Sequence, residues 1–347
     1  MPPFSDRGDA MILLLALLLA APLPKRELLS AGVPLMGTEL RVTLLSRDTP
    51  AAREAIRDCF RLFERVDQVM SEWKPDSPLS ELNRRAGERP VALPRDLLRL
   101  LVTAVWVADQ TDGAFDPTWA ALWGLWKFSG EPRVPAREEI LERLPLVGYR
   151  NLELDLARGT AFLPRKGMAV GLGAIGKGYA LQIAADALRA AGFTDFLLYA
   201  GGQIYAAGAK EDGPWTTGVQ DPRGPAGDVF ATLPVKDASV STSGDYEHAF
   251  VKDGVVYHHI IDLRTGMPSR GVRSATVMAA NATLADAWST SAFLLGAEGG
   301  MALARRMGFE LLLVDDAGRV HMTEGMRPRL KIRHQPAKSG KPSGASR

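Results

Sequence analysis

The alternation of apolar and polar positions predicts a strand near the start of the chain, followed by two amphipathic helices. Apolar residues alternate with polar ones over 38–46, which is the period of a half-buried strand. Apolar residues then recur at helical spacing after the Thr-Pro pair at 49–50, which predicts an N-cap and the first position of a helix. A second helix is predicted to begin at Pro94. The apolar positions are Leu40, Val42 and Leu44 in the strand, Ile56, Phe60, Phe63, Val66 and Met70 in the first helix, and Leu98, Leu101, Val105 and Ala108 in the second.

The second half of the chain changes repeatedly between helical and strand periodicity, with glycines at the boundaries. Helices are predicted over 177–191, with Gly192 in the C′ position, and from the N-cap at 281 to 295, with Gly296 at the end. An Asp-Gly pair at 253–254 between two short apolar runs predicts a tight hairpin. The predicted strands are Phe196–Tyr199, Ala249–Lys252, Val255–His258, Ser274–Ala280, Leu311–Val314 and Arg319–Met322.

These elements favour an α+β fold. Helices and strands are mixed without strict alternation, and hairpins join several strands, which argues against a doubly wound parallel sheet. Residues 129–165 are rich in proline, arginine and glycine and are predicted to be loops with short strands. No linker divides residues 33–325, so we expect a single domain with a mixed, largely antiparallel sheet and packed helices.

The two ends of the chain differ from this region. Residues 11–21 form an unbroken apolar run whose length fits the h-region of a signal peptide and is too short to span a bilayer comfortably. We therefore predict a signal peptide or N-terminal anchor in residues 1–30, with a buried N-terminal helix as the alternative. Residues 326–347 contain no acidic residue and are rich in Pro, Ser, Gly, Lys and Arg, which predicts a basic disordered tail.

Charge and cysteine content exclude some classes of function. The net charge is +2 over 347 residues, which gives no electrostatic reason to expect nucleic acid as a partner. The only cysteine of the chain, Cys59, rules out an intrachain disulfide and a metal site built on cysteines. Its apolar neighbours predict a buried structural thiol.

A glycine-rich block at residues 171–178 reads G-L-G-A-I-G-K-G. It contains the dinucleotide pattern G-x-G-x-x-G and the first seven positions of the P-loop pattern, which end at Lys177. A P-loop requires Ser or Thr at the next position, but the chain has Gly178 there. A dinucleotide site requires an acidic residue at the end of the following strand, but that strand ends in Ala-Gly-Gly. The block indicates a site for a phosphate-bearing ligand. The alternative is that its glycines only permit tight packing between a strand and a helix.

Two further groups of residues carry chemistry. Asp286, Ser289 and Thr290 are three and four positions apart, which places them on one face of a predicted helix. Three oxygen-bearing side chains on one face suit a hard cation, although a first-turn carboxylate beside two ordinary hydroxyls would look the same. His258 and His259 are adjacent on a predicted strand and therefore point to opposite sides, so we expect only one of them to be a site residue.

Taken together and in order, these segments resemble the ApbE family of flavin transferases. The resemblance spans residues 33–325. The segments that carry it are Met36-Gly37-Thr38, Met70–Ser77, Gly113–Asp116, Gly171–Tyr179, Ala200–Gly202, Thr242–Tyr246, His259–Asp262 and Ala285–Thr290.

The resemblance implies a Mg²⁺-dependent enzyme that cleaves FAD. It would attach FMN through a phosphoester to a Thr or Ser hydroxyl of a target flavoprotein, a subunit of a membrane redox complex, and release AMP. Two alternatives are hydrolysis of FAD to FMN and AMP, and an exported flavin-binding protein without turnover. Family members are often exported, so together with the N-terminal run we expect a location in the periplasm or on the periplasm-facing inner membrane, with the N-terminus as a membrane anchor if it is retained.

The resemblance also implies a role for particular residues. The histidine that it makes catalytic is His259. The metal ligands that it implies are the Ala174 carbonyl, Asp286, Ser289 and Thr290. The implied flavin contacts are Met36, Trp73, Ala114, Phe115 and Asp116, and the implied adenine-nucleotide contacts are Gly171, Lys177 and Ile261.

Overall fold

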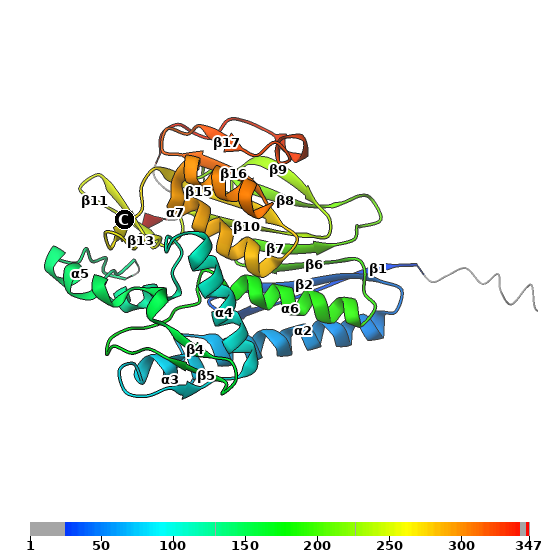
Figure 1. Cartoon of the computed structure of the whole chain (residues 1–347). Coiled ribbons are helices and arrows are strands. Elements are labelled where there is room, and N and C mark those ends of the chain that lie inside the picture. The colour runs from blue at the N-terminus through cyan, green and yellow to red at the C-terminus, as the bar shows by residue number, and fades with distance from the viewer. Residues whose placement is uncertain (1–24, 129, 226, 341–344, 347) are drawn as a thin grey trace, which may run out of the picture.

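The large sheet is the framework of the protein, seen in a computed structural model that describes residues 25–128, 130–225, 227–340 and 345–346. Within these residues the sheet has eight strands, all antiparallel, and they lie side by side in chain order (Figure 1). In spatial order the strands are β1 (Glu27–Leu35), β2 (Thr38–Ser46), β6 (Phe196–Ala200), β7 (Gln203–Ala207), β10 (Ala238–Gly244), β15 (Val272–Ala279), β16 (Glu310–Asp315) and β17 (Val320–Met322).

Helices cover one face of this sheet. They are α2 (Thr49–Met70), α6 (Gly176–Ala190) and α7 (Ala282–Met307), which lie next to one another across the strands (Figure 1). The apolar stripe of α2 is buried as its spacing predicts. Cys59 belongs to this stripe, and burial raises the pKa of its thiol to about 12, so the prediction of an inert structural thiol is confirmed.

A smaller sheet covers the other face. It consists of β8 (Trp215–Gln220), β9 (Val229–Val235) and β18 (Lys331–Ile332). Because both faces are covered, central strands are apolar on both sides: Leu311 and Leu313 of β16 join the core under the helices, whereas Leu312 and Val314 join the core under the small sheet. The continuous apolar run of β16 is the sequence signature of this double burial.

The chain leaves the large sheet in excursions that return to the neighbouring strand. The excursion from β2 to β6 contains, besides α2 and α6, the elements α3 (Pro78–Arg84), β3 (Val91–Ala92), α4 (Arg95–Gln110), η1 (Pro117–Leu122), α5 (Arg137–Arg143), η2 (Leu144–Leu146), η3 (Tyr149–Asn151), β4 (Glu153–Asp155) and β5 (Thr160–Phe162). The excursion from β10 to β15 contains β11 (Ala249–Lys252), β12 (Val255–His258), β13 (Ile261–Asp262) and β14 (Met267–Pro268). After β17 come η4 (Arg327–Arg329), β18 and β19 (Ala345–Ser346).

The α+β prediction and several elements are confirmed. The predicted strand over 38–46 is β2, and the Asp-Gly hairpin joins β11 to β12 with both turn residues at positive φ. The start of α2 was predicted one residue late, because the Asp48 carboxylate, and not the Thr49 hydroxyl, accepts the backbone N–H of Ala51 at 3.0 Å. Helix α5 was missed within the stretch predicted as loops and strands.

The predicted helix from the N-cap at 281 is the first part of α7. The Asn281 side chain accepts the Leu284 N–H at 3.0 Å, and Gly296 interrupts the helix with φ 75° and ψ −177°. The chain then resumes helical turns as far as Met307, where Gly308 at φ 73° ends them. Gly296 is therefore a kink and not the end of the element: despite Gly299 and Gly300, the run of Met, Ala, Leu and Arg residues over 301–307 favours a helix.

The ends of the chain give a mixed outcome. The apolar run over 11–21 lies outside the described residues, and β1 already begins at Glu27, inside the range predicted as signal or anchor. Among the described residues, no helix combines the length and the apolar character that crossing a membrane requires.

The prediction of a disordered tail is wrong for its first part, residues 326–338. Met326 is fully buried in the core under the small sheet, β18 pairs with β9, and the Ala337 N–H donates to the Asp221 carboxylate at 2.8 Å. Composition indicated disorder, whereas one buried methionine and these backbone hydrogen bonds are enough to dock the segment.

Candidate functional site

The glycine block joins the start of α6 to the first turns of α7. The Gly178 N–H donates to the Asp286 carboxylate at 2.9 Å. A Cβ at Gly178 would lie 2.2 Å from the Ala282 carbonyl oxygen and 2.6 Å from the Asp286 Cβ. Glycine is therefore required at this position because the two helices approach too closely for any side chain. The close approach places a carboxylate of α7 directly on the block.

Substitution of Gly178 by alanine is expected to destabilise the protein. The added methyl group would push α6 away from α7, at a cost of about 1–3 kcal/mol, or a fall in Tm of roughly 2–12 °C. Gly176→Ala is the matched control, because the nearest atom to a Cβ there is 3.9 Å away. Thermal unfolding of both variants checks the prediction, and equal Tm values for the two would contradict it.

Other backbone groups of the block are already used inside the protein. The Gly171 N–H donates to the Pro117 carbonyl at 2.8 Å, and the Gly171 carbonyl accepts the indole N–H of Trp119 at 3.0 Å. The Gly176 N–H donates to the Leu172 carbonyl at 2.7 Å. The amides of Gly171 and Gly176 are therefore not available to bind a phosphate. Lys177, the cation of the block, can still bind one.

The oxygen ligands predicted for a metal come together beside this joint. Asp286 and Ser289 are buried, and the Ser289 hydroxyl donates to the Asp286 carbonyl at 2.8 Å. The Ser243 hydroxyl on β10 lies 2.9 Å from the Ser289 hydroxyl and 3.0 Å from the Thr290 hydroxyl. The Gly178 N–H donates to Asp286 and not to the carbonyl of Ala174, four residues earlier, which leaves this carbonyl available. Ser243 was not predicted as a ligand, although it lies in the segment Thr242–Tyr246 that carries the family resemblance.

The electrostatics of Asp286 fit a cation. Burial raises the pKa of its carboxyl, and the Lys177 ammonium and the amides of Gly178 and Lys177 act in the opposite direction. A buried carboxylate is costly without a compensating positive charge. Carboxylate, hydroxyl and carbonyl oxygens are the donors that a hard divalent cation prefers. The residues present therefore fit a site for such an ion.

The two adjacent histidines differ in burial, as expected. The buried His258 uses both ring nitrogens: Nε2 is 2.9 Å from the Ser269 carbonyl, and Nδ1 accepts the Ile260 N–H at 3.3 Å. Burial lowers the pKa of His258 to about 4, so the ring is a neutral structural group. The exposed His259 ring has Nδ1 at 3.0 Å from the Glu247 carbonyl. Because a carbonyl only accepts, Nδ1 carries the proton and the Nε2 lone pair is free.

The surroundings of His259 keep it neutral. The side chain reaches solvent, but protein atoms around the ring remove part of its hydration, and this desolvation, followed by the neighbouring His248 and His258, lowers the pKa of His259. The His248 ring lies edge-on at a centroid distance of 5.3 Å. A neutral imidazole with an accessible Nε2 is suited to accept a proton near neutral pH.

Lys177 links the parts of the site. Its ammonium acts to lower the pKa of Asp286, of His259 and of Glu72, so one positive charge lies near enough to influence all three groups. Glu72 was not predicted as a site residue. Burial raises the pKa of Glu72, while the backbone N–H groups of Leu172 and Gly173 lower it, which places this carboxylate against the glycine block. No motif marked it, because a single Glu in a polar loop carries no signal of its own.

The residues predicted to contact flavin lie in distinct settings. Met36 is partly buried in the turn between β1 and β2, with φ 53°, and Trp73 is largely exposed. Phe115 is buried in the main core. The buried Asp116 carboxylate accepts the Thr118 N–H at 2.7 Å and the Tyr149 N–H at 2.8 Å, so its side chain holds the loop.

The remaining predicted flavin contact, Ala114, and the predicted adenine-nucleotide contact Ile261 are both partly buried. Ala114 lies in the loop before η1, next to Phe115, and Ile261 opens the short strand β13, two residues after His259. Among the predicted flavin contacts, Trp73 is the residue that presents an exposed aromatic ring.

Fold and site define a class of protein: an α+β domain in which oxygen donors that fit a divalent cation gather at a helix crossing, near a lysine and a neutral histidine. The chain belongs to the ApbE family, which it matches over residues 36–313.

Individual relatives agree with this assignment. An FAD:protein FMN transferase of Treponema pallidum is 34% identical over 316 residues, covering 86% of this chain and 87% of that protein. One from Vibrio cholerae is 31% identical over 328 residues, covering 92% and 98%. Among solved structures, the ApbE protein of Thermotoga maritima has a TM-score of 0.80 at 35% identity, covering 87% of this chain and 99% of that one. The flavin transferase ApbE of Vibrio cholerae has a TM-score of 0.79 at 29% identity, covering 88% and 99%.

Proposed function

We propose that this protein transfers the FMN part of FAD to a Thr or Ser hydroxyl of an acceptor protein and releases AMP, with Mg²⁺ as cofactor. The observation that carries the proposal is the arrangement around Lys177, where a buried carboxylate and a neutral histidine with a free Nε2 face one ammonium. The names and coverage of the relatives support the same reaction.

The reaction exchanges one phosphorus–oxygen bond for another. The acceptor hydroxyl oxygen bonds to the phosphorus of the FMN part, and the bond from that phosphorus to the oxygen shared with AMP breaks. The hydroxyl proton passes to Nε2 of His259, which is free because Nδ1 is held by the Glu247 carbonyl, and then to solvent. AMP leaves with the bridging oxygen and its electron pair.

The other residues of the site supply charge and position. Asp286, Thr290, Ser289 and the Ala174 carbonyl would hold Mg²⁺, which when bound neutralises charge on the pyrophosphate. Lys177 adds a second positive charge, and its ammonium is steadied by a 3.1 Å hydrogen bond to the Gly173 carbonyl. Phosphoryl transfer depends mainly on such charge neutralisation and positioning.

The setting of the reaction is part of the proposal. The apolar run at residues 11–21 supports export, with the enzyme in the periplasm or held on the periplasmic side of the inner membrane. The acceptor would then be a flavoprotein subunit of a membrane redox complex. Fractionation of cells that express the full chain tests this, and a cytoplasmic protein would contradict it.

One incubation separates the proposal from its alternatives. The full chain is mixed with FAD, Mg²⁺ and a purified exported flavoprotein subunit that was produced without its flavin. A mass gain on the acceptor equal to FMN less one water supports transfer. Free FMN and AMP with an unmodified acceptor would indicate an FAD hydrolase, and unchanged FAD bound to the protein would indicate a flavin-binding protein without turnover.

A further inference from the structure

Two exposed tryptophans stand in contact at the rim of the site. The side chain of Trp73 is 65% exposed and that of Trp123 is 49% exposed. Their ring centroids are 4.8 Å apart and their planes meet at 86°. Tryptophan buries more apolar area than any other side chain, so two of them left open together mark a place where a ligand or partner binds.

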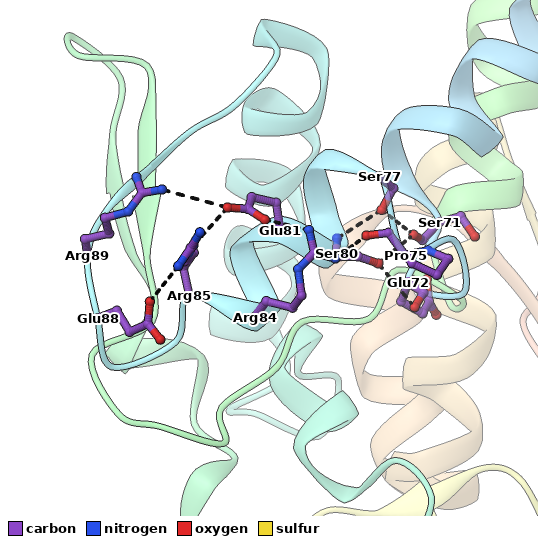
Figure 2. A network of polar contacts seen from close by, with 10 residues as sticks. All are labelled: Ser71, Glu72, Pro75, Ser77, Ser80, Glu81, Arg84, Arg85, Glu88 and Arg89. Carbon is purple, nitrogen blue, oxygen red and sulfur yellow. Dashed lines mark hydrogen bonds and ion pairs between the residues drawn. The ribbon is translucent and has the colours of Figure 1, made fainter.

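The loop of Trp73 is fastened on one side of the glycine block. The adjacent Glu72 carboxylate lies against the amides of the block. Figure 2 shows how α3 holds the same loop: the Ser77 hydroxyl donates to the Ser71 carbonyl at 2.6 Å, and the Arg84 guanidinium donates to the Pro75 carbonyl. Trp73 is thus carried by a constrained loop, although its own ring is open to solvent.

The segment of Trp123 is also fastened to the block. It directly follows η1, and its N–H donates to the Ala120 carbonyl at 2.9 Å. Trp119 of the same short helix donates its indole N–H to the Gly171 carbonyl, and its ring fills the space in which a Cβ of Gly171 would stand. The two exposed rings therefore flank the block from separate, internally bonded segments.

Perpendicular rings in contact form a corner. A planar aromatic ligand that stacks on one ring meets the second ring with its edge, and both arrangements are favourable for aromatic pairs. The corner suits a planar aromatic ligand, and a phosphate linked to that ligand would meet the block that carries Lys177, because Glu72, the neighbour of Trp73, lies against this block. Under the proposed function, on which this step rests, the isoalloxazine ring of FAD meets these requirements.

We propose that Trp123 is a specificity-determining residue that, together with Trp73, forms an aromatic corner for the isoalloxazine ring. None of the sequence patterns singled out Trp123, and its role follows from the contact with Trp73. The corner selects the flavin end of the dinucleotide, whereas the adenine end is held elsewhere. Loss of either tryptophan ring therefore weakens binding of FAD and FMN and leaves binding of ADP unchanged.

Equilibrium binding of FMN, FAD and ADP to the full chain, without acceptor, tests this role. For Trp123→Ala we expect the Kd of both flavins to rise about tenfold, with ADP unchanged and with Trp123→Phe close to the parent. Trp106→Phe is the control: this tryptophan is 41% exposed, and its ring meets that of Trp288 edge-on at a centroid distance of 5.5 Å. Tryptophan fluorescence gives a direct test of the contact. Bound flavin should quench the emission of the parent protein, and it should quench the emission of Trp123→Ala less.

The outcomes separate this inference from the proposed function. Flavin affinities of Trp123→Ala within about twofold of the parent overturn the role of Trp123, even if transfer is normal. If Trp123→Ala raises only the KM for the acceptor protein in the transfer reaction, the proposed role in flavin binding is also overturned, and the two tryptophans would instead contact the acceptor. If flavin affinity depends on Trp123 but the protein has no transfer activity, the aromatic corner is supported and the proposed transferase function is contradicted.

Discussion

Replacement of Asp286 by asparagine is expected to lower the rate of FMN transfer by about 10³-fold at saturating FAD. Asparagine has nearly the same shape and keeps one oxygen to accept the Gly178 N–H, so the joint between α6 and α7 survives. What it removes is the negative charge that Mg²⁺ requires at the centre of the site. Single-turnover measurement of acceptor modification, with FAD and Mg²⁺ in excess, gives the rate.

A readout independent of activity identifies the cause. Mg²⁺ binds only the folded protein in this scheme and therefore raises the Tm of the parent as its concentration increases. The Tm of Asp286→Asn should respond much less, while its Tm without Mg²⁺ stays near that of the parent. Transfer at the parental rate, or an undiminished response of the Tm to Mg²⁺, would remove Asp286 from the metal site.

Replacement of His259 by asparagine is expected to slow transfer by about 10²- to 10⁴-fold. The asparagine amide can still donate to the Glu247 carbonyl, as Nδ1 of His259 does, but it has no group in place of the Nε2 base. FAD affinity should remain near that of the parent, because His259 acts on the acceptor hydroxyl. A single-turnover rate equal to that of the parent would show that His259 is not the catalytic base.

The pH dependence gives a second test of the same residue. Protonation of His259 removes the base, so the rate falls as the pH falls through its pKa. Because the packed protein atoms and the two neighbouring histidines lower that pKa, the acid limb should lie below the ordinary value of about 6.5. The profile is measured with Mg²⁺ saturating, which holds Asp286 ionised. An acid limb at or above 6.5 would contradict the environment described for His259.

Periodicity and turn chemistry were sufficient to predict most of the framework. The period of two over β2, the Asp-Gly turn and the Asn281 cap act through neighbouring residues, and each was found where it was predicted. The docking of residues 326–338 was not predictable, because it depends on Met326 reaching a core built by strands nearly a hundred residues earlier. Interactions between distant segments leave no period in the sequence.

The site shows the same division. The helix face of Asp286, Ser289 and Thr290 followed from spacing. The two histidines differ in burial as expected, but His259 lies in a bend after β12 and not on the strand that was predicted to separate them. The role of Gly178 did not follow from the sequence, which showed a failed P-loop, whereas the structure shows a helix crossing that admits no Cβ. Glu72 was missed for the same reason, since its contact is with a block a hundred residues away.

The strands of the large sheet follow one another in chain order, so each excursion departs from one strand and returns to its neighbour. Insertions, deletions or exchanges within an excursion can therefore accumulate over evolution without changing any strand pairing. The segment from β11 to β14, which presents His259, is one such unit. A lineage could adapt to a new acceptor by remodelling that segment alone, while α6, α7 and the crossing between them are inherited unchanged.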